Sequence, residues 1–289
     1  MAFDPLLYIA FVLGFLAGRL VRVRSPWVPR ATLVTVVVLV GLLGASLDSV
    51  SWLSLVLTVP VAAAFALAIL GLTAAIYLAI GRVWPNPTVA NAAAAPVERW
   101  PVSAFLLASL LVGLGLGRVV TLPSAVAIPW VLYALLALVG FDITLTLSGL
   151  RGVGRTLTAA VAGAVLAGLA FAVVDRLAVG PALATSLGFG FYSLAGPLVA
   201  ARAGALLGLL AFLTNFLRED FTMLLSPYVG RRLRGGGLAA LGGATSMDTT
   251  LYFVTRFGDV DAGSLALTSG LVLTVAASLL LPALLSLPV

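Results

Sequence analysis

The chain has 289 residues, of which 62% are hydrophobic and only 9% are charged, with a formal net charge of +6. So large an apolar fraction predicts a polytopic helical membrane protein rather than a soluble domain. The chain has no Cys and no His, which excludes disulfides, thiol catalysis, Ser-His triads and the usual zinc sites. All basic residues are Arg and lie between apolar stretches, which is typical of cytoplasmic loops and not of nucleic-acid binding. We therefore expect no cofactor and no metal.

Apolar stretches of spanning length follow one another along the chain. They predict about eight transmembrane helices, at 6–20, 31–48, 53–80, 102–121, 127–148, 155–175, 204–229 and 262–287. Two Gly/Ser/Thr-rich segments, 182–202 and 238–257, are either full crossings or hairpins on hydropathy alone. The positive-inside rule favours re-entrant hairpins from opposite faces, because most Arg residues are then cytoplasmic and both termini lie outside. The expected location is the inner (plasma) membrane.

The first six predicted spans contain an internal repeat. FVLGFLAGRLV (11–21) resembles LLVGLGLGRVV (110–120), and LVGLLGASL (39–47) resembles LLALVGFDI (135–143). A unit of three spans used twice places the second copy upside down, as in many secondary transporters. Residues 1–178 are therefore predicted to form two inverted three-helix repeats.

A second repeat pairs LGFGFYSLAGPLVAARAG (187–204) with LGGATSMDTTLYFVTRFG (241–258). Residues 179–289 are predicted to form two hairpin-plus-helix repeats that carry the substrate site, within one integral membrane unit. The hairpin tips leave backbone N–H and C=O groups unpaired, so we expect the tips to meet inside the protein or at a wet cavity. The predicted fold is an all-α polytopic membrane protein with inverted repeats and two re-entrant or broken hairpins.

Glu219 is the acid in the most costly position, halfway along the span 204–229 in NFLRED. Asn215 lies four residues earlier on the same helical face. Burial disfavours the charged form of a carboxyl, so Glu219 suits a proton carrier that also binds substrate. The alternative is a structural Arg–Glu–Asp network.

Asp248 lies at the expected tip of the second hairpin, among hydroxyl side chains. The predicted substrate-binding residues there and in the first hairpin are Asp248, Thr245, Ser246, Tyr192 and Ser193, together with Glu219 and Asn215. Hydroxyl, carboxyl and unpaired carbonyl oxygens can bind a cation or an ammonium group. The alternative for Asp248 is a cap on the second helix of its hairpin.

Asp48 and Asp142 lie at the ends of matched spans, and we predict both as proton-coupling groups alongside Glu219. Asp142 and Asp259 also raise the possibility of an intramembrane aspartyl protease. The Gly expected before Gly258-Asp259 is missing, so an enzyme is not favoured.

Three ordered motifs, GFGFYSLAGP (188–197), NFLRED (215–220) and GGATSMD (242–248), resemble those of the LysO family of prokaryotic lysine exporters. The strong match covers roughly 185–260. The resemblance implies proton-driven export of L-lysine, and of analogues such as thialysine, from the cytoplasm. It assigns an essential intramembrane acid to Glu219 and, less directly, to Asp48.

The resemblance also implies that L-lysine, protons and the lipid bilayer are partners, with a homodimer by analogy to related transporters. Two alternatives stay open. One is a Na⁺/H⁺ or organic-anion transporter of related fold, and the other is a non-transporting membrane subunit that tolerates neutral residues at 219.

Overall fold

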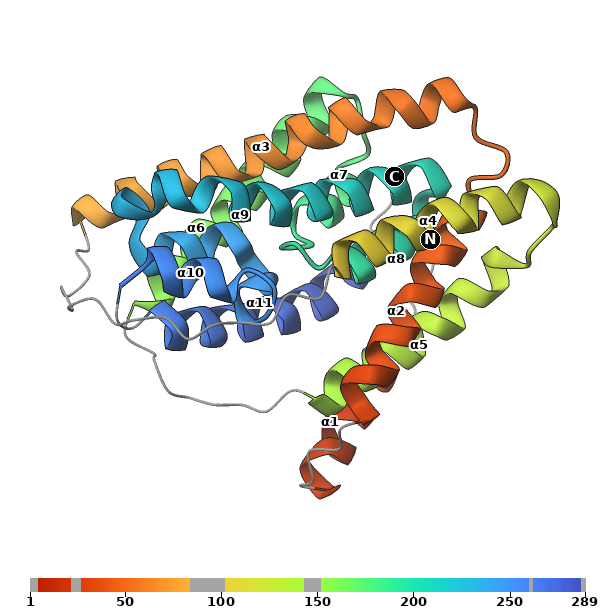
Figure 1. Ribbon diagram of the computed structural model, residues 1–289, viewed down its shortest axis with the longest axis horizontal. Coiled ribbons are helices and arrows are strands. Elements are labelled where there is room, and N and C mark those ends of the chain that lie inside the picture. The colour runs from red at the N-terminus through yellow and green to blue at the C-terminus, as the bar shows by residue number, and fades with distance from the viewer. Residues whose placement is uncertain (1–4, 22–26, 84–101, 143–151, 260–261, 287–289) are drawn as a thin grey trace.

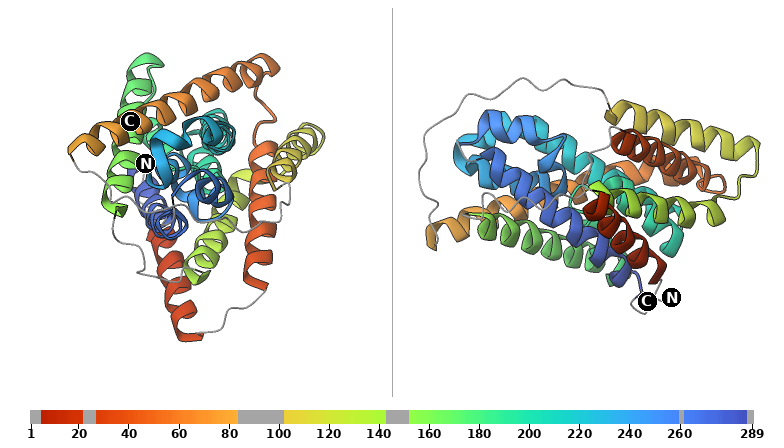
Figure 2. Two further views of the ribbon diagram at one scale, coloured as in Figure 1. Left: turned by 60° about the vertical axis from the view of Figure 1, so that its left-hand side comes forward. Right: turned by 90° about the horizontal axis from the view of Figure 1, so that it is seen from below.

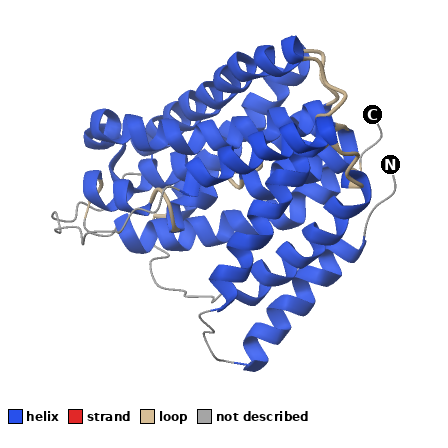
Figure 3. Ribbon diagram, turned by 45° about the vertical axis from the view of Figure 1, so that its right-hand side comes forward, coloured by secondary structure: helices blue, strands red, loops and turns tan. Residues whose placement is uncertain are grey.

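The computed structural model describes residues 5–21, 27–83, 102–142, 152–259 and 262–286, and these residues form helices joined by short turns (Figures 1 and 3). The helices are α1 (Pro5–Val21), α2 (Trp27–Ala45), α3 (Trp52–Val83), α4 (Val102–Val119), α5 (Ser124–Asp142), α6 (Val153–Val174), α7 (Val179–Ser186), α8 (Tyr192–Ala203), α9 (Ala205–Gly242), the 3-10 helix η1 (Gly243–Met247), α10 (Leu251–Phe257) and α11 (Ala262–Leu284).

Each predicted span overlaps one of these helices, and residues 143–148 of the fifth span and residue 287 of the last lie outside the described residues. Within the described residues, α3, α6 and α11 are long and apolar enough to cross a bilayer, and α1, α4 and much of α2 and α5 are shorter apolar helices. The helical fold of a membrane protein is therefore confirmed, whereas the count of eight spans stays a prediction.

The four helices α1, α2, α4 and α5 pack in two pairs, α1 with α5 and α2 with α4 (Figure 1). Glycines make the close approach, because a Cβ at Gly14 would overlap the carbonyl of Ala137 and a Cβ at Gly113 would overlap the carbonyl of Gly41. Gly14 and Gly113 occupy the same position in the two copies of the first repeat, and so do Gly41 and Ala137. The first helix of each repeat copy therefore packs on the second helix of the other copy, and the two contacts use matched positions.

A second pair of contacts follows the same rule. A Cβ at Gly140 would overlap the carbonyl of Phe11, and a Cβ at Gly44 would overlap the carbonyl of Leu110. Phe11 and Leu110 are the first residues of the two matched sequences. The helix pairing thus agrees, residue by residue, with the internal repeat read from the sequence.

The remaining helices surround α9, which packs along α3 on one side and α8 on another (Figures 1 and 2). Arg155 of α6 ties α6 to α3, since its Nε and Nη2 donate to the Tyr77 carbonyl at 3.1 and 2.8 Å. The start of α1 and the end of α11 also meet, where the Tyr8 hydroxyl donates to the Leu279 carbonyl at 2.9 Å. The two ends of the helical chain therefore lie on the same side of the molecule.

Both segments predicted to be broken are interrupted helices. Residues 187–191 separate α7 from α8, and η1 with the turn at 248–250 separates α9 from α10. Their re-entrant path through a bilayer stays a prediction. We refer to residues 187–191 as the first break and to residues 243–250 as the second break.

The structure differs from the prediction before the second break. α9 is two helices that meet at Arg234, whose φ of 53° and ψ of −170° are not helical, so the chain turns within one residue and not through the longer loop expected between 229 and 238. The second of these helices runs back along the first, since Arg218 bonds the carbonyls of Ala240 and Leu241. The Asp259 carboxylate accepts a hydrogen bond from the Gly235 N–H at 3.2 Å and so satisfies the backbone where the helix restarts.

Candidate functional site

The two breaks meet in the interior of the protein. The Ala244 N–H in the second break donates to the Phe189 carbonyl in the first break at 2.8 Å. Gly190 and Gly243 flank this bond in left-handed conformations, with φ of +87° and +68°, which glycine adopts without steric cost. The expectation that the tips of the two segments lie together is borne out by this bond, and it brings Tyr192 near the second break.

Asn215 of α9 holds the first break. Its Oδ1 accepts the Gly190 N–H at 2.8 Å, and its Nδ2 donates to the carbonyls of Thr185 and Ala211 at 2.8 and 2.9 Å. The side chain is fully buried. An amide is suited to this place because it donates and accepts at once, so one side chain satisfies an orphan carbonyl at the end of α7 and an orphan N–H in the break.

Arg218, one turn further along α9, holds the second break. Its Nε donates to the Leu241 carbonyl at 2.9 Å and its Nη2 to the Ala240 carbonyl at 3.1 Å. The side chain is fully buried, and its Nη1 has no hydrogen-bond partner within the described protein. These bonds go to backbone carbonyls at the end of α9, so Arg218 is not the partner of the neighbouring Glu219 carboxyl.

Glu219 is buried, with 1% of its surface exposed, and its Oε2 has no hydrogen-bond partner within the described residues. The Thr249 side chain lies beside it, and the charges of Asp248 and Asp220 act on it. A buried carboxyl surrounded by other acids favours an arriving proton or cation, because either relieves the repulsion between like charges. Glu219 is thus a buried carboxyl with one oxygen unbonded within the described residues.

Asp248 lies in the second break and is exposed. Its Oδ1 accepts hydrogen bonds from the N–H of Thr249 at 2.5 Å and from the Thr249 hydroxyl at 3.2 Å. Its carbonyl accepts the Leu251 N–H at 3.2 Å, which leads the chain into α10. The residue therefore orders the turn before α10 and keeps an accessible carboxylate near the buried Glu219.

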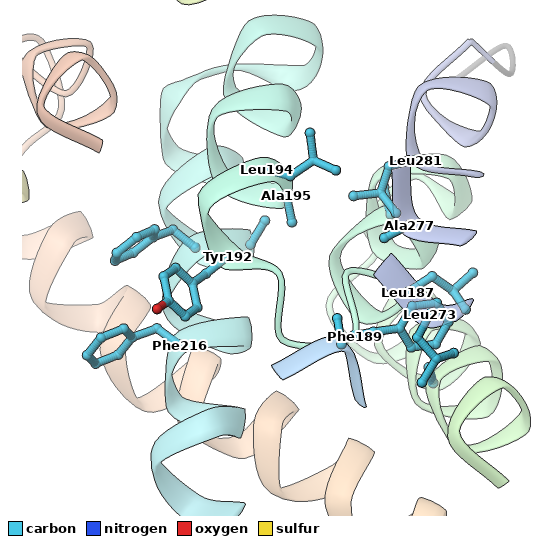
Figure 4. Packing of buried hydrophobic residues seen from close by; sticks show 14 of the residues in the cluster. Leu187, Phe189, Tyr192, Leu194, Ala195, Phe216, Leu273, Ala277 and Leu281 are labelled. Carbon is cyan, nitrogen blue, oxygen red and sulfur yellow. The ribbon is translucent and has the colours of Figure 1, made fainter. Parts of the chain in front are cut away.

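Tyr192 at the start of α8 faces the same acids. Its ring packs edge-on against Phe212 and Phe216 of α9, with both centroid distances 5.7 Å, and Figure 4 shows it beside Phe216. Glu219, Asp248 and Asp220 are close enough for their charges to act on its hydroxyl. The aromatic packing fixes the ring, so the hydroxyl has a defined position near the acids; Ser193 follows it and is also buried.

Thr245 and Ser246 are buried in the second break. The Thr245 hydroxyl donates to the Gly242 carbonyl at 3.0 Å, and the Ser246 hydroxyl bonds the carbonyls of Gly243 at 2.7 Å and Ala266 at 2.9 Å. A hydroxyl has one hydrogen, which these bonds use, so its oxygen remains as an acceptor. Both side chains are therefore better suited to a cationic group than to a carboxylate.

The two predicted proton-coupling acids of the first repeat lie at helix ends. Asp48 follows α2 and is exposed, and its Oδ1 accepts the Ser49 N–H at 2.7 Å. Leu43, about one turn earlier, lies 3.2 Å from the position that a Cβ would take at Gly196, so this end of α2 borders α8, the helix that follows the first break. Asp142 is the last residue of α5, and its side chain lies outside the described residues. The roles of both acids stay predictions.

Sequence reasoning missed the part that Arg218, Thr249 and Asp259 play. The spacing of Asn215 and Arg218 was an available signal, since side chains three residues apart share one face of a helix. The triple glycine at 235–237 was a signal for the kink in α9. The carbonyl partners of Arg218 lie in the helix that follows the turn at Arg234, and no local sequence pattern indicates this contact.

The fold and the site together define the class: a helical, multi-span membrane protein with two interrupted helices whose breaks meet beside a buried acid, Glu219. A family model for the lysine exporter LysO matches residues 107–285, more than half of the chain, and the chain belongs to this family.

Two named relatives are similar to part of the chain. The lysine exporter LysO of Escherichia coli (strain K12) is 36% identical over 121 residues, which are 42% of this chain and 40% of that protein. A putative lysine exporter of Haemophilus influenzae is 31% identical over 99 residues, which are 34% of this chain and 50% of that protein. The matches thus span half or less of either relative. No solved structure matches the chain.

Proposed function

We propose that the chain exports L-lysine from the cytoplasm in exchange for protons. The observation that carries this proposal is the Glu219 carboxyl, which is buried near the point where the two breaks meet and whose Oε2 has no hydrogen-bond partner within the described residues. The adjacent Arg218 does not pair with this carboxyl, because its guanidinium donates to the carbonyls of Leu241 and Ala240. Support also comes from the names of the relatives, which are a lysine exporter and a putative lysine exporter.

The exchange follows from the chemistry of one carboxyl group. A carboxylate binds either a proton or an ammonium group, and it cannot hold both at full strength. If Glu219 releases its proton when lysine arrives and regains one when lysine leaves, the proton gradient drives export. The protein then alternates between a state with protonated Glu219 and a state with bound lysine, and each ligand shifts the population toward its own state.

Lysine carries two ammonium groups and one carboxylate, so its site needs acceptors and donors. Asp248 and Glu219, with the acceptor oxygens of Thr245 and Ser246, suit the ammonium groups. Ser193, the Tyr192 hydroxyl and backbone N–H groups at the breaks suit the carboxylate, since N–H groups at the start of a helix attract anions. Asn215 keeps the first break in the shape that this arrangement needs.

The membrane path that we propose has eight spans and two hairpins that enter from opposite faces of the inner membrane. The two three-helix units are inverted relative to each other, and both termini lie outside. Contacts at the helix ends support this path: Arg118 at the end of α4 donates to the Val50 carbonyl, and Gly230 of α9 lies against Phe257 of α10. Asp48 then lies at the outer surface, where it is open to protons from water. We propose a homodimer by analogy of fold.

Purified protein in liposomes tests the function. Lysine added to one side should drive proton movement and uptake of labelled lysine in the wild-type protein, and Glu219→Gln should abolish both. Asp175→Asn is the control, because Asp175 is an exposed acid at the end of α6. Thialysine should compete with lysine. Full lysine-driven proton movement in Glu219→Gln would overturn the proposed mechanism, and sodium-driven transport that ignores lysine would favour the Na⁺/H⁺ alternative.

A further inference from the structure

The second break exposes the carbonyl end of a helix inside the protein. After the kink at Arg234, α9 restarts and ends at Gly242, and the chain then turns away through Gly243. The last carbonyls of a helix have no donor from a following turn and carry the negative end of the helix dipole. In broken-helix transporters such ends, together with unwound carbonyls, are the places that coordinate a coupling Na⁺.

In this protein, the guanidinium of Arg218 occupies that place. It donates to two successive carbonyls at the helix end, Leu241 at 2.9 Å and Ala240 at 3.1 Å, and it is fully buried. Removing a cation from water costs several kcal/mol, so a buried guanidinium needs compensation of this kind. The carbonyl end of the helix supplies it, because charge-assisted bonds to dipolar groups are the strong ones.

The backbone of the second break packs closely against the guanidinium. A Cβ at Gly243 would lie 3.0 Å from Nη2 and would overlap the Phe189 carbonyl. The Gly242 carbonyl, next along the chain, accepts the Thr245 hydroxyl at 3.0 Å. Carbonyl oxygens that would otherwise coordinate an ion are thus already bonded to the protein's own donors.

The first break shows the contrast. There, the orphan carbonyl of Thr185 accepts the neutral amide of Asn215 at 2.8 Å. The cation is confined to the break that also carries the exposed Asp248 and borders Glu219. A fixed positive charge at this end therefore sits beside exchangeable negative charges.

We propose that Arg218 is a resident cation that takes the place of a coupling metal ion at the second break, so that the protein neither binds nor requires Na⁺. It acts as a positioning residue: it holds the carbonyl end of α9 in place and leaves Glu219 and Asp248 to the proton and the substrate. The inference rests on the proposed function for its transport readout and on the structure alone for its stability readout.

Chemical rescue of Arg218→Ala tests the proposal. We expect this substitution to lower the melting temperature of the purified protein by about 5 °C or more and to slow lysine exchange on the order of tenfold, since two buried carbonyls lose their donors. Guanidinium at low, non-denaturing concentration should restore both saturably, because it can enter the space that the side chain left. Arg232→Ala is the matched control: it removes the same charge from an exposed position on the same helix and should show neither loss nor rescue.

Two measurements decide the outcome if Arg218→Ala does not fold. Arg218→Lys keeps the charge but not the forked geometry, and it should retain part of the stability. The wild-type protein should melt at the same temperature in sodium and in N-methyl-D-glucamine chloride of equal ionic strength. Saturable stabilisation of the wild-type protein by Na⁺, or a folded Arg218→Ala that guanidinium does not rescue, would overturn the proposal. If rescue and sodium independence hold while lysine is not transported, the proposed function fails and this inference stands.

Discussion

The two breaks are built on the same plan but differ in charge. Each ends a buried helix segment, each contains a left-handed glycine, and a single backbone hydrogen bond joins them through Phe189 and Ala244. The first break is held by the neutral amide of Asn215, whereas the second is held by Arg218 and carries Asp248. The first break is therefore rigid and neutral, whereas the second break carries the charges, and in the proposed function these charges act on the ligands.

The largest effect on stability is expected at the neutral break. Asn215→Leu has a similar volume but leaves the Gly190 N–H and the Thr185 carbonyl without partners in the interior, at about 1–3 kcal/mol each. We expect a loss of about 2–6 kcal/mol in the free energy of unfolding, measured by thermal or denaturant unfolding in detergent. Ser269→Ala, at the matched position of the second repeat, is the control, because its hydroxyl donates within its own helix to Leu265 at 2.7 Å. Equal losses in the two variants would show that the hydrogen bonds of the Asn215 amide to the first break do not contribute to stability.

A smaller loss is expected from Gly243→Ala, which tests how tightly the breaks fit. A left-handed conformation costs a side chain about 1–2 kcal/mol, and the added Cβ would also overlap the Phe189 carbonyl. Gly204→Ala is the control for the conformational cost of a positive φ without steric overlap. Gly204 has a φ of +99°, and no atom lies within 4 Å of its Cβ position. Melting temperatures should fall further for Gly243→Ala than for Gly204→Ala. The reverse order would mean that the breaks do not press against each other.

Asp248→Asn removes charge from the second break with little change in shape. The carboxylate is exposed, so stability should change by less than about 0.5 kcal/mol. The affinity for lysine should fall about tenfold, which corresponds to about 1.4 kcal/mol for one lost charge-assisted contact. In the wild-type protein, lysine affinity should decrease as pH falls, because protonation removes the same charge, and the variant should show a flatter profile. Calorimetric titration at two pH values measures both, and unchanged affinity in Asp248→Asn would remove this residue from the site.

Much of this arrangement could be predicted from the sequence. Apolar stretches of spanning length predicted the helices, because every backbone group in lipid must be satisfied within a helix. The repeat matched Gly14 with Gly113, and the structure adds that these glycines make the same close contact with exchanged partners; the helix pairs themselves were not predicted. The costly position of Glu219 predicted its burial.

The rest depends on contacts between distant parts of the chain. Arg218 bonds carbonyls 22 and 23 residues away, which no local pattern indicates. The predicted segments 204–229 and 238–257 leave a loop between them, whereas the structure turns at the single residue Arg234; the Asp259 carboxylate accepts the Gly235 N–H and Tyr77 packs against Gly236 where the second helix starts. Backbone partners and tertiary packing therefore decided the details that periodicity and composition left open.

The smallest effect is expected at the Thr249 hydroxyl, which lies between Asp248 and Glu219. The Thr249 hydroxyl donates to the Asp248 Oδ1 at 3.2 Å and lies beside Glu219, whereas the Thr249 N–H keeps its own bond to Asp248. Thr249→Val removes the hydroxyl and retains the backbone bond, so lysine affinity should fall only about threefold, in keeping with the loss of one hydrogen bond worth about 0.5–1.5 kcal/mol. Thr255→Val in α10 is the control, since that hydroxyl bonds the Leu251 carbonyl at 3.0 Å and faces neither acid. If Thr249→Val weakened lysine binding as much as Asp248→Asn, the hydroxyl would itself be a ligand, and the second break would recognise its substrate by more than charge.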